Sequence, residues 1–112
     1  MPLLRDLTIG SYFADVADPR TARTRDHALL DIIIIALAAI ICGADSWVAV
    51  ADFGRFKQAW LHTFLDLPNG IPSHDTFGRV FAQIDPAQFQ HGFVTWVQAI
   101  QQIRGDVIAI AV

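Results

Sequence analysis

The segment that most restricts the fold is HALLDIIIIALAAIIC, residues 27–42, which is apolar almost all the way round. A helix of this kind must be covered on most of its sides by the rest of the chain. Four consecutive isoleucines also favour a strand, but the Ala-Leu-Ala-Ala continuation and the length of the run favour a helix. We therefore expect a central helix here, with Asp26 as its N-cap and Gly43 as its stop.

Other segments with helical spacing are predicted to cover this central helix. We expect a short helix within residues 3–14, a long one from Trp47 to about residue 65 with a kink at Gly54, one that follows Ser73, and one that starts at Asp85-Pro86 and stops at Gly105. The fold class is mainly α, a small helical bundle of about five helices. Residues 106–112 are β-branched and apolar, which predicts one short C-terminal strand that lacks its sheet.

The stretch LPNGIPSHDTFGRV, residues 67–80, predicts a turn followed by a capped helix. It completes a helix-turn-helix-like pair, although its connector is longer than that of the DNA-binding version. His74, Thr76 and Arg79 are candidates for nucleic-acid contact because a helix start offers amide groups to phosphate. The alternative is that Asp75 and Thr76 only reinforce the helix start.

A second group of candidate DNA-binding residues lies between the first two helices. Arg20, Arg23 and Arg25 form a basic patch in an exposed connector, diluted by Asp18 and Asp26. The formal net charge of −3 gives no overall attraction to phosphate. A solvated loop is the alternative interpretation of this patch.

Several classes of function find no support in the sequence. Cys42, the single cysteine, is expected to be a small buried hydrophobe, and it allows no intrachain disulfide, so the cytoplasm is the expected compartment. Residues 28–42 include Asp31 and fall short of the roughly 20 residues that a membrane span needs. No three histidine or carboxylate side chains converge by spacing, and no phosphate-binding glycine loop is present, so we expect no metal, cofactor or small-molecule substrate.

Four runs of sequence resemble one protein family. These are FADVADPRTARTRDHALLDIIIIALAAIICGADSW, ADFGRFKQAWL, LPNGIPSHDTFGRVFAQIDP and VIAI. The chain resembles the N-terminal helical domain of the H-repeat-associated insertion-sequence transposases, which precedes an RNase H-like catalytic domain. The resemblance implies that transposon-end DNA and other transposase chains are the partners, in a bacterial cytoplasm.

The resemblance also identifies a departure from the family pattern. In the family, the strand that matches residues 107–110 continues into Asp-Gly-Lys, and this Asp is the first of three carboxylates that bind a divalent metal such as Mg²⁺. Ala111 stands at that place here. We therefore expect a helical domain over residues 1–105, the start of a truncated catalytic domain over 106–112, and no strand transfer. The alternative is a structural or protein-interaction module, or an inert remnant, that uses the apolar strand at residues 107–112.

Overall fold

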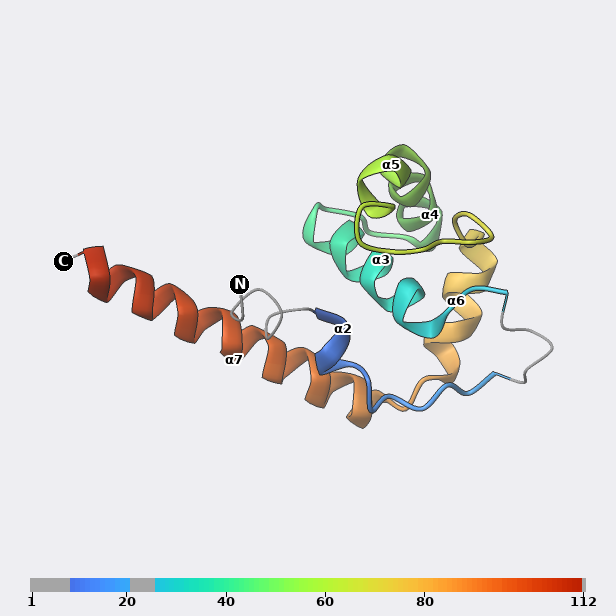
Figure 1. Cartoon of the computed structure of the whole chain (residues 1–112). Helices are drawn as coiled ribbons and strands as arrows, with labels where there is room; N and C mark the ends of the chain where they lie inside the picture. The colour runs from blue at the N-terminus through green and yellow to red at the C-terminus, as the bar shows by residue number, and fades with distance from the viewer. Residues whose placement is uncertain (1–8, 21–25, 112) are drawn as a thin grey trace. The chain divides into compact units, whose positions relative to one another are not determined.

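The computed structural model describes residues 9–20 and 26–111, with side chains over 10–20 and 26–102. The described residues are mainly helical and contain no strand, which confirms the predicted fold class. The helices are α2 (Ile9–Tyr12), α3 (Leu29–Ile41), α4 (Trp47–Phe56), α5 (Gln58–Leu61), α6 (His74–Gln83) and α7 (Pro86–Ala111) (Figure 1). They belong to two compact units, one formed by Asp18–Ile84 and the other by the segments before and after it.

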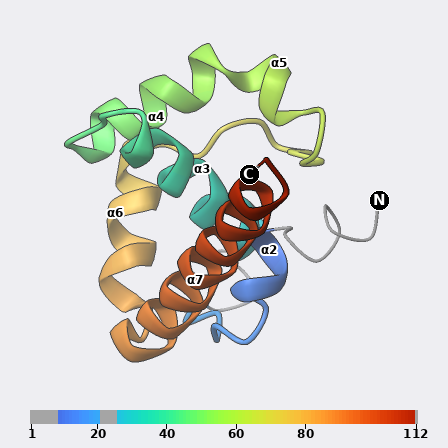
Figure 2. The same ribbon diagram turned by 90° about the vertical axis from the view of Figure 1, so that its left-hand side faces the viewer.

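Helix α3 is the centre of the unit formed by residues 18–84. The side chains of Ile32, Ile33 and Ile35 have no exposed area, as predicted for an all-apolar helix. Helix α4 packs against α3 and against α6 (Figures 1 and 2). Full burial of such a side chain stabilises the fold by about 1.5–3 kcal/mol, so α3 makes the largest contribution of any single helix to the core of this unit.

The two ends of α3 differ in how well the sequence predicted them. The N-cap is Ala28, in extended backbone and without a side-chain hydrogen bond, so the prediction of Asp26 as the cap is wrong. Helix α3 starts too far from Asp26 for the Asp26 carboxylate to cap it. At the other end, Gly43 has φ +103°, which confirms the predicted stop. Cys42 is exposed rather than buried, because it follows the last helical turn.

The long helix predicted from Trp47 is divided into α4 and α5. The break falls at Lys57, whose φ of −101° and ψ of 17° leave the helical region, and not at Gly54. A Cβ at Gly54 would lie 2.7 Å from Cγ2 of Ile71 and 3.3 Å from Cγ2 of Ile35. Gly54 therefore permits close packing inside a continuous α4 rather than a kink.

Helix α6 begins as the sequence predicted. Leu67 and Gly70 both have positive φ, 46° and 75°, in the turn that precedes it. The backbone N–H of Thr76 donates to Oγ of Ser73 over 3.2 Å, which is the expected cap. The ring of Phe77 stacks on Trp47 of α4 at 6.5 Å between centroids. These contacts form the predicted helix-turn-helix-like pair of α4 and α6.

The second unit contains α2 and α7. Asp85 caps α7, because the N–H of Ala87 donates to its Oδ1 over 2.9 Å. The rings of Phe13 and Phe89 lie 5.3 Å apart between centroids. A Cβ at Gly92 would lie 2.6 Å from the carbonyl oxygen of Tyr12, so glycine permits α2 to approach α7 closely.

The C-terminal strand and the stop at Gly105 were wrong predictions. Helix α7 continues through Gly105 to Ala111. Glycine costs a helix only about 1 kcal/mol, whereas an isolated strand leaves its backbone groups without partners. The part of the chain that the structure describes holds no other strand to supply those partners. The alternative function, an interaction module that uses this strand, is therefore not supported by the structure.

Among the described residues, no helix has both the length and the apolar character needed to cross a membrane.

Candidate nucleic-acid interface

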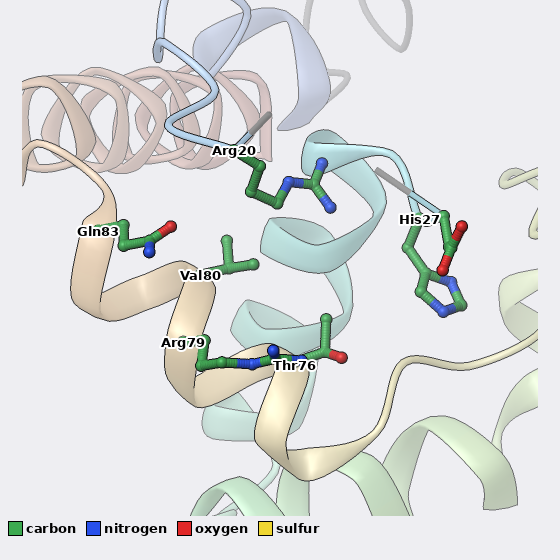
Figure 3. Close-up of a pocket in the computed structure, with 7 residues that line it drawn as sticks. Arg20, His27, Thr76, Arg79, Val80 and Gln83 are labelled. Carbon is green, nitrogen blue, oxygen red and sulfur yellow. The ribbon is translucent and has the colours of Figure 1, made fainter. Parts of the chain in front are cut away.

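Three of the predicted contact residues surround one cavity in the unit formed by residues 18–84. The cavity has a volume of about 320 Å³. Its walls come from the segment that precedes α3 and from α6 (Figure 3). The lining residues are Arg20, Asp26, His27, Thr76, Arg79, Val80 and Gln83. Two arginines and one aspartate therefore line the same cavity.

Arg20 is fixed in the wall of this cavity by Asp18. Its Nε donates to Oδ1 of Asp18 over 2.9 Å and its NH2 donates to Oδ2 over 2.8 Å. The backbone N–H of Arg20 also donates to Oδ1, over 3.0 Å. The residue is only 8% exposed, so its assignment to an exposed connector was wrong. This bidentate pair holds the guanidinium in one orientation and neutralises much of its charge.

The start of α6 forms the opposite wall. Thr76 contributes a hydroxyl group whose Oγ1 lies 3.1 Å from Oγ of Ser73. Arg79 follows one turn later and is exposed, and its Nε donates a long 3.4 Å hydrogen bond to the carbonyl oxygen of Asp75. Because the helix dipole and the exposed guanidinium both favour negative charge here, this wall suits an anion.

The remaining predicted contact residues lie elsewhere. His74 does not line the cavity, and its Nδ1 lies 3.3 Å from Oδ1 of Asp75 on an exposed surface. Arg23 and Arg25 lie outside the described residues. The structure therefore brings together Arg20, Thr76 and Arg79, and it separates His74 from them.

Sequence reasoning missed Asp26, His27, Val80 and Gln83 as cavity residues. No spacing rule relates the segment before α3 to a helix some fifty residues later. The one available signal was that Asp26 and His27 immediately precede a helix start. Their approach to α6 depends on tertiary packing, as does the hydrogen bond from Nδ2 of Asn69 to the carbonyl oxygen of Asp26.

One carboxylate near the cavity has a shifted pKa. Burial of Asp31 and repulsion by Asp66 raise the pKa of its carboxyl above the ordinary value of 3.8, while attraction to His27 opposes the rise. Within the described ranges, no group of three or more His, Cys, Asp or Glu side chains is arranged to hold a metal ion. These residues do not fit a metal centre.

Comparison with known proteins identifies the family. The model of the family described as DDE_Tnp_1-associated matches residues 10–97. The chain belongs to this family. That membership, together with the relatives described below, confirms the resemblance to the helical domain of the H-repeat-associated transposases.

Three relatives show the extent of the similarity. The chain is 53% identical over 98 residues to the "Uncharacterized protein in dhlA 3'region" of Xanthobacter autotrophicus, covering 87% of this chain and 33% of that protein. It is 39% identical over 96 residues to the "H repeat-associated putative transposase YbfD" of Escherichia coli strain K12, covering 85% and 38%. It is 41% identical over 66 residues to the "Inactive transposase YbfQ" of the same strain, covering 59% and 79%.

The chain spans only about a third of the length of the first two of these relatives. No solved structure gives a significant match.

Proposed function

We propose that this chain is a DNA-binding module of an insertion-sequence transposase and that it contacts the phosphate backbone through the cavity between Arg20 and α6. The observation that carries the proposal is that Arg20 shares one cavity with Thr76 and Arg79, two residues of α6 that lie far from it in the sequence. Membership of a transposase-associated family supports DNA as the partner. Duplex ends of the mobile element are the proposed ligand.

The cavity residues divide into distinct roles in this proposal. Arg79 is the principal cation, because it is exposed and, among the residues that the structure describes, makes no carboxylate contact of the kind that Asp18 makes with Arg20. Thr76 supplies a hydroxyl donor beside the helix start, and Arg20 shapes the wall. Asp26 opposes phosphate at the rim, so contact is strongest near α6. Backbone contacts of this type position a protein on DNA without reading its sequence.

We further propose that the chain does not join or cut strands. The resemblance places Ala111 where the family has its first metal-binding carboxylate, and a methyl group coordinates no cation. The relative named "Inactive transposase" supports a role without catalysis for chains of this kind. With Mg²⁺ and transposon-end duplex, we expect the chain to leave both strands intact on a denaturing gel.

Fluorescence anisotropy with random duplex and with transposon-end duplex across a salt series tests the DNA contact. Affinity should fall steeply as salt rises, and Arg79→Ala should weaken binding and reduce the salt slope by about 1, the contribution of one phosphate contact. Arg55→Ala is the matched control, because Arg55 is an exposed arginine on α4, paired with Asp52 and outside the cavity.

Two results would contradict the proposal. One is the absence of binding to either duplex at low salt. The other is an equal loss of affinity in Arg79→Ala and Arg55→Ala, which would indicate a general charge effect rather than contact at the cavity.

A further inference from the structure

A second hollow lies in the unit formed by residues 18–84, between the end of α3 and helix α4. It has a volume of about 480 Å³ and shares no residue with the cavity at α6. Half of its lining residues are small, namely Ala39, Gly43, Ala44 and Ala49, and the others are Cys42, Asp52, Phe53 and Phe56. We call this hollow the α3–α4 groove. Its small lining residues leave room for a large apolar side chain.

Large exposed apolar side chains occur in the two helices that border this groove, and one of them, Phe56, lines it. Phe56 is 84% exposed and Ile41 is 66% exposed. Ile40 at 50% and Val48 at 52% lie in the same two helices. Single exposed apolar residues are ordinary, but several on the same two helices as an open hollow are typical of an interaction surface.

Phe56 has the properties of an inserted anchor. It lies at the last position of α4 and lines the groove, so a protruding ring and an empty hollow belong to one surface. The Nζ of Lys57 lies 5.5 Å from the centroid of the Phe56 ring, which leaves the other ring face for a partner. Exposed aromatic side chains of this kind dominate the energetics of many interfaces.

Both acidic and basic side chains lie at or next to the groove. Asp52 lines it, and Arg55 on the next helical turn pairs with Asp52. Asp45 is exposed just before α4, and Lys57 is exposed just after it. A surface that joins a copy of itself by a two-fold axis must carry complementary features within one patch, both in shape and in charge.

We propose that the α3–α4 groove is the interface through which two copies of this chain pair, with Phe56 of each copy inserted into the groove of the other. The protruding ring, the hollow with small walls and the mixed charges meet the requirement for a two-fold interface. The carboxylates of Asp52 and Asp45 disfavour nucleic acid at this surface. The pairing does not depend on the DNA contact at α6.

Cys42 gives a direct probe of the pairing, because it is the single cysteine, is exposed and lines the groove. The two-fold arrangement brings Cys42 of both copies to the same interface. A short bis-maleimide should therefore link the wild-type chain into a covalent dimer on a denaturing gel. Sedimentation equilibrium measures the Kd in parallel.

Phe56→Ala should raise the dimer Kd at least about 30-fold and abolish the Cys42 cross-link. Phe64→Ala is the matched control, since Phe64 is 50% exposed but does not line the groove, and it should leave the Kd unchanged. Ala49→Leu fills the groove from α4 and should also give a monomer. Circular dichroism confirms that each variant is folded.

A mixing experiment separates insertion from a general loss of apolar surface. Phe56→Ala keeps an open groove and Ala49→Leu keeps the ring, so a mixed dimer restores one of the two insertions. The mixture should therefore associate more tightly than either variant alone.

A wild-type chain that is monomeric up to about 1 mM, self-association that persists in Phe56→Ala, or the absence of this rescue would each overturn the proposal. Arg79→Ala should pair normally, so a failure of the DNA-binding proposal can be distinguished from a failure of the pairing proposal.

Discussion

At the scale of single residues, Asp31 makes the stability of the fold depend on pH. Its carboxyl lies in the first turn of α3, where the helix dipole favours negative charge. Burial and the repulsion from Asp66 outweigh this attraction and that of His27, because the pKa is raised above 3.8. The ionised carboxylate is therefore destabilising in the folded state.

The sign of the pH dependence follows from this raised pKa. Below pH 3.8 the carboxyl is protonated in both the folded and the unfolded chain, so it has no cost. As pH rises from 3.8 through the raised pKa, the unfolded chain ionises first, and the free energy of unfolding falls. Asp31→Asn should therefore be more stable than the wild type at pH 7, by a difference that vanishes below pH 3.8.

Urea unfolding of both chains between pH 3 and pH 8 measures this difference. Asp15→Asn, which removes the same charge from an exposed position in the other unit, is the control for net charge. A wild type that is as stable as Asp31→Asn at pH 7 would show that burial of the carboxylate has no net cost.

At the scale of helices, α4 and α6 depend on the same kind of serine cap. Oγ of Ser46 accepts from the N–H of Ala49 over 3.1 Å, and Oγ of Ser73 accepts from the N–H of Thr76 over 3.2 Å. We expect Ser46→Ala and Ser73→Ala each to lower the free energy of unfolding by about 0.5–2 kcal/mol. Ser73→Asp should retain most of the stability, because its carboxylate also accepts this bond. Equal stability of wild type and Ser73→Ala in chemical denaturation would contradict the assignment of the cap.

The caps explain which parts of the fold were predictable from the sequence. The starts of the helices after Ser46, Ser73 and Asp85 depend on contacts within three residues, so local rules predict them. The burial of α3 follows equally from its composition. The break at Lys57 has no comparable local signal, because neither glycine nor proline is present there.

The errors arose where distant contacts decide the structure. A glycine inside a helical pattern conventionally predicts a kink. At Gly54, however, the side chains of Ile71 and Ile35 pack close to the position that a Cβ would occupy, and α4 stays continuous. Arg20 was predicted to be exposed, whereas it is only 8% exposed and lines a cavity whose other wall is the distant helix α6. The candidate site was accordingly predicted in part. Thr76 and Arg79 were identified from a local helix start, but their approach to the segment before α3 required the folded structure.

At the scale of the whole molecule, the division into two units has a consequence for folding. The unit Asp18–Ile84 is continuous in sequence and contains α3, α4, α5 and α6. Its core includes Phe77 and Leu61 together with three isoleucines of α3, Ile32, Ile33 and Ile35, all with no exposed area. A domain of roughly 60 residues is close to the lower limit for independent folding, so every buried aromatic side chain matters.

We expect a fragment of residues 18–84 to fold alone and to unfold in one cooperative transition. Both the cavity at α6 and the α3–α4 groove lie inside it, so it should retain DNA binding and pairing if those proposals hold.

Phe77→Ala in the same fragment removes a fully buried ring that stacks on Trp47. Its cost of about 3–5 kcal/mol is comparable with the whole stability of so small a domain, so this variant should be unfolded. Circular dichroism during heating distinguishes the two fragments. A wild-type fragment that lacks a cooperative transition would show that α2 and α7 are required for the fold of this unit.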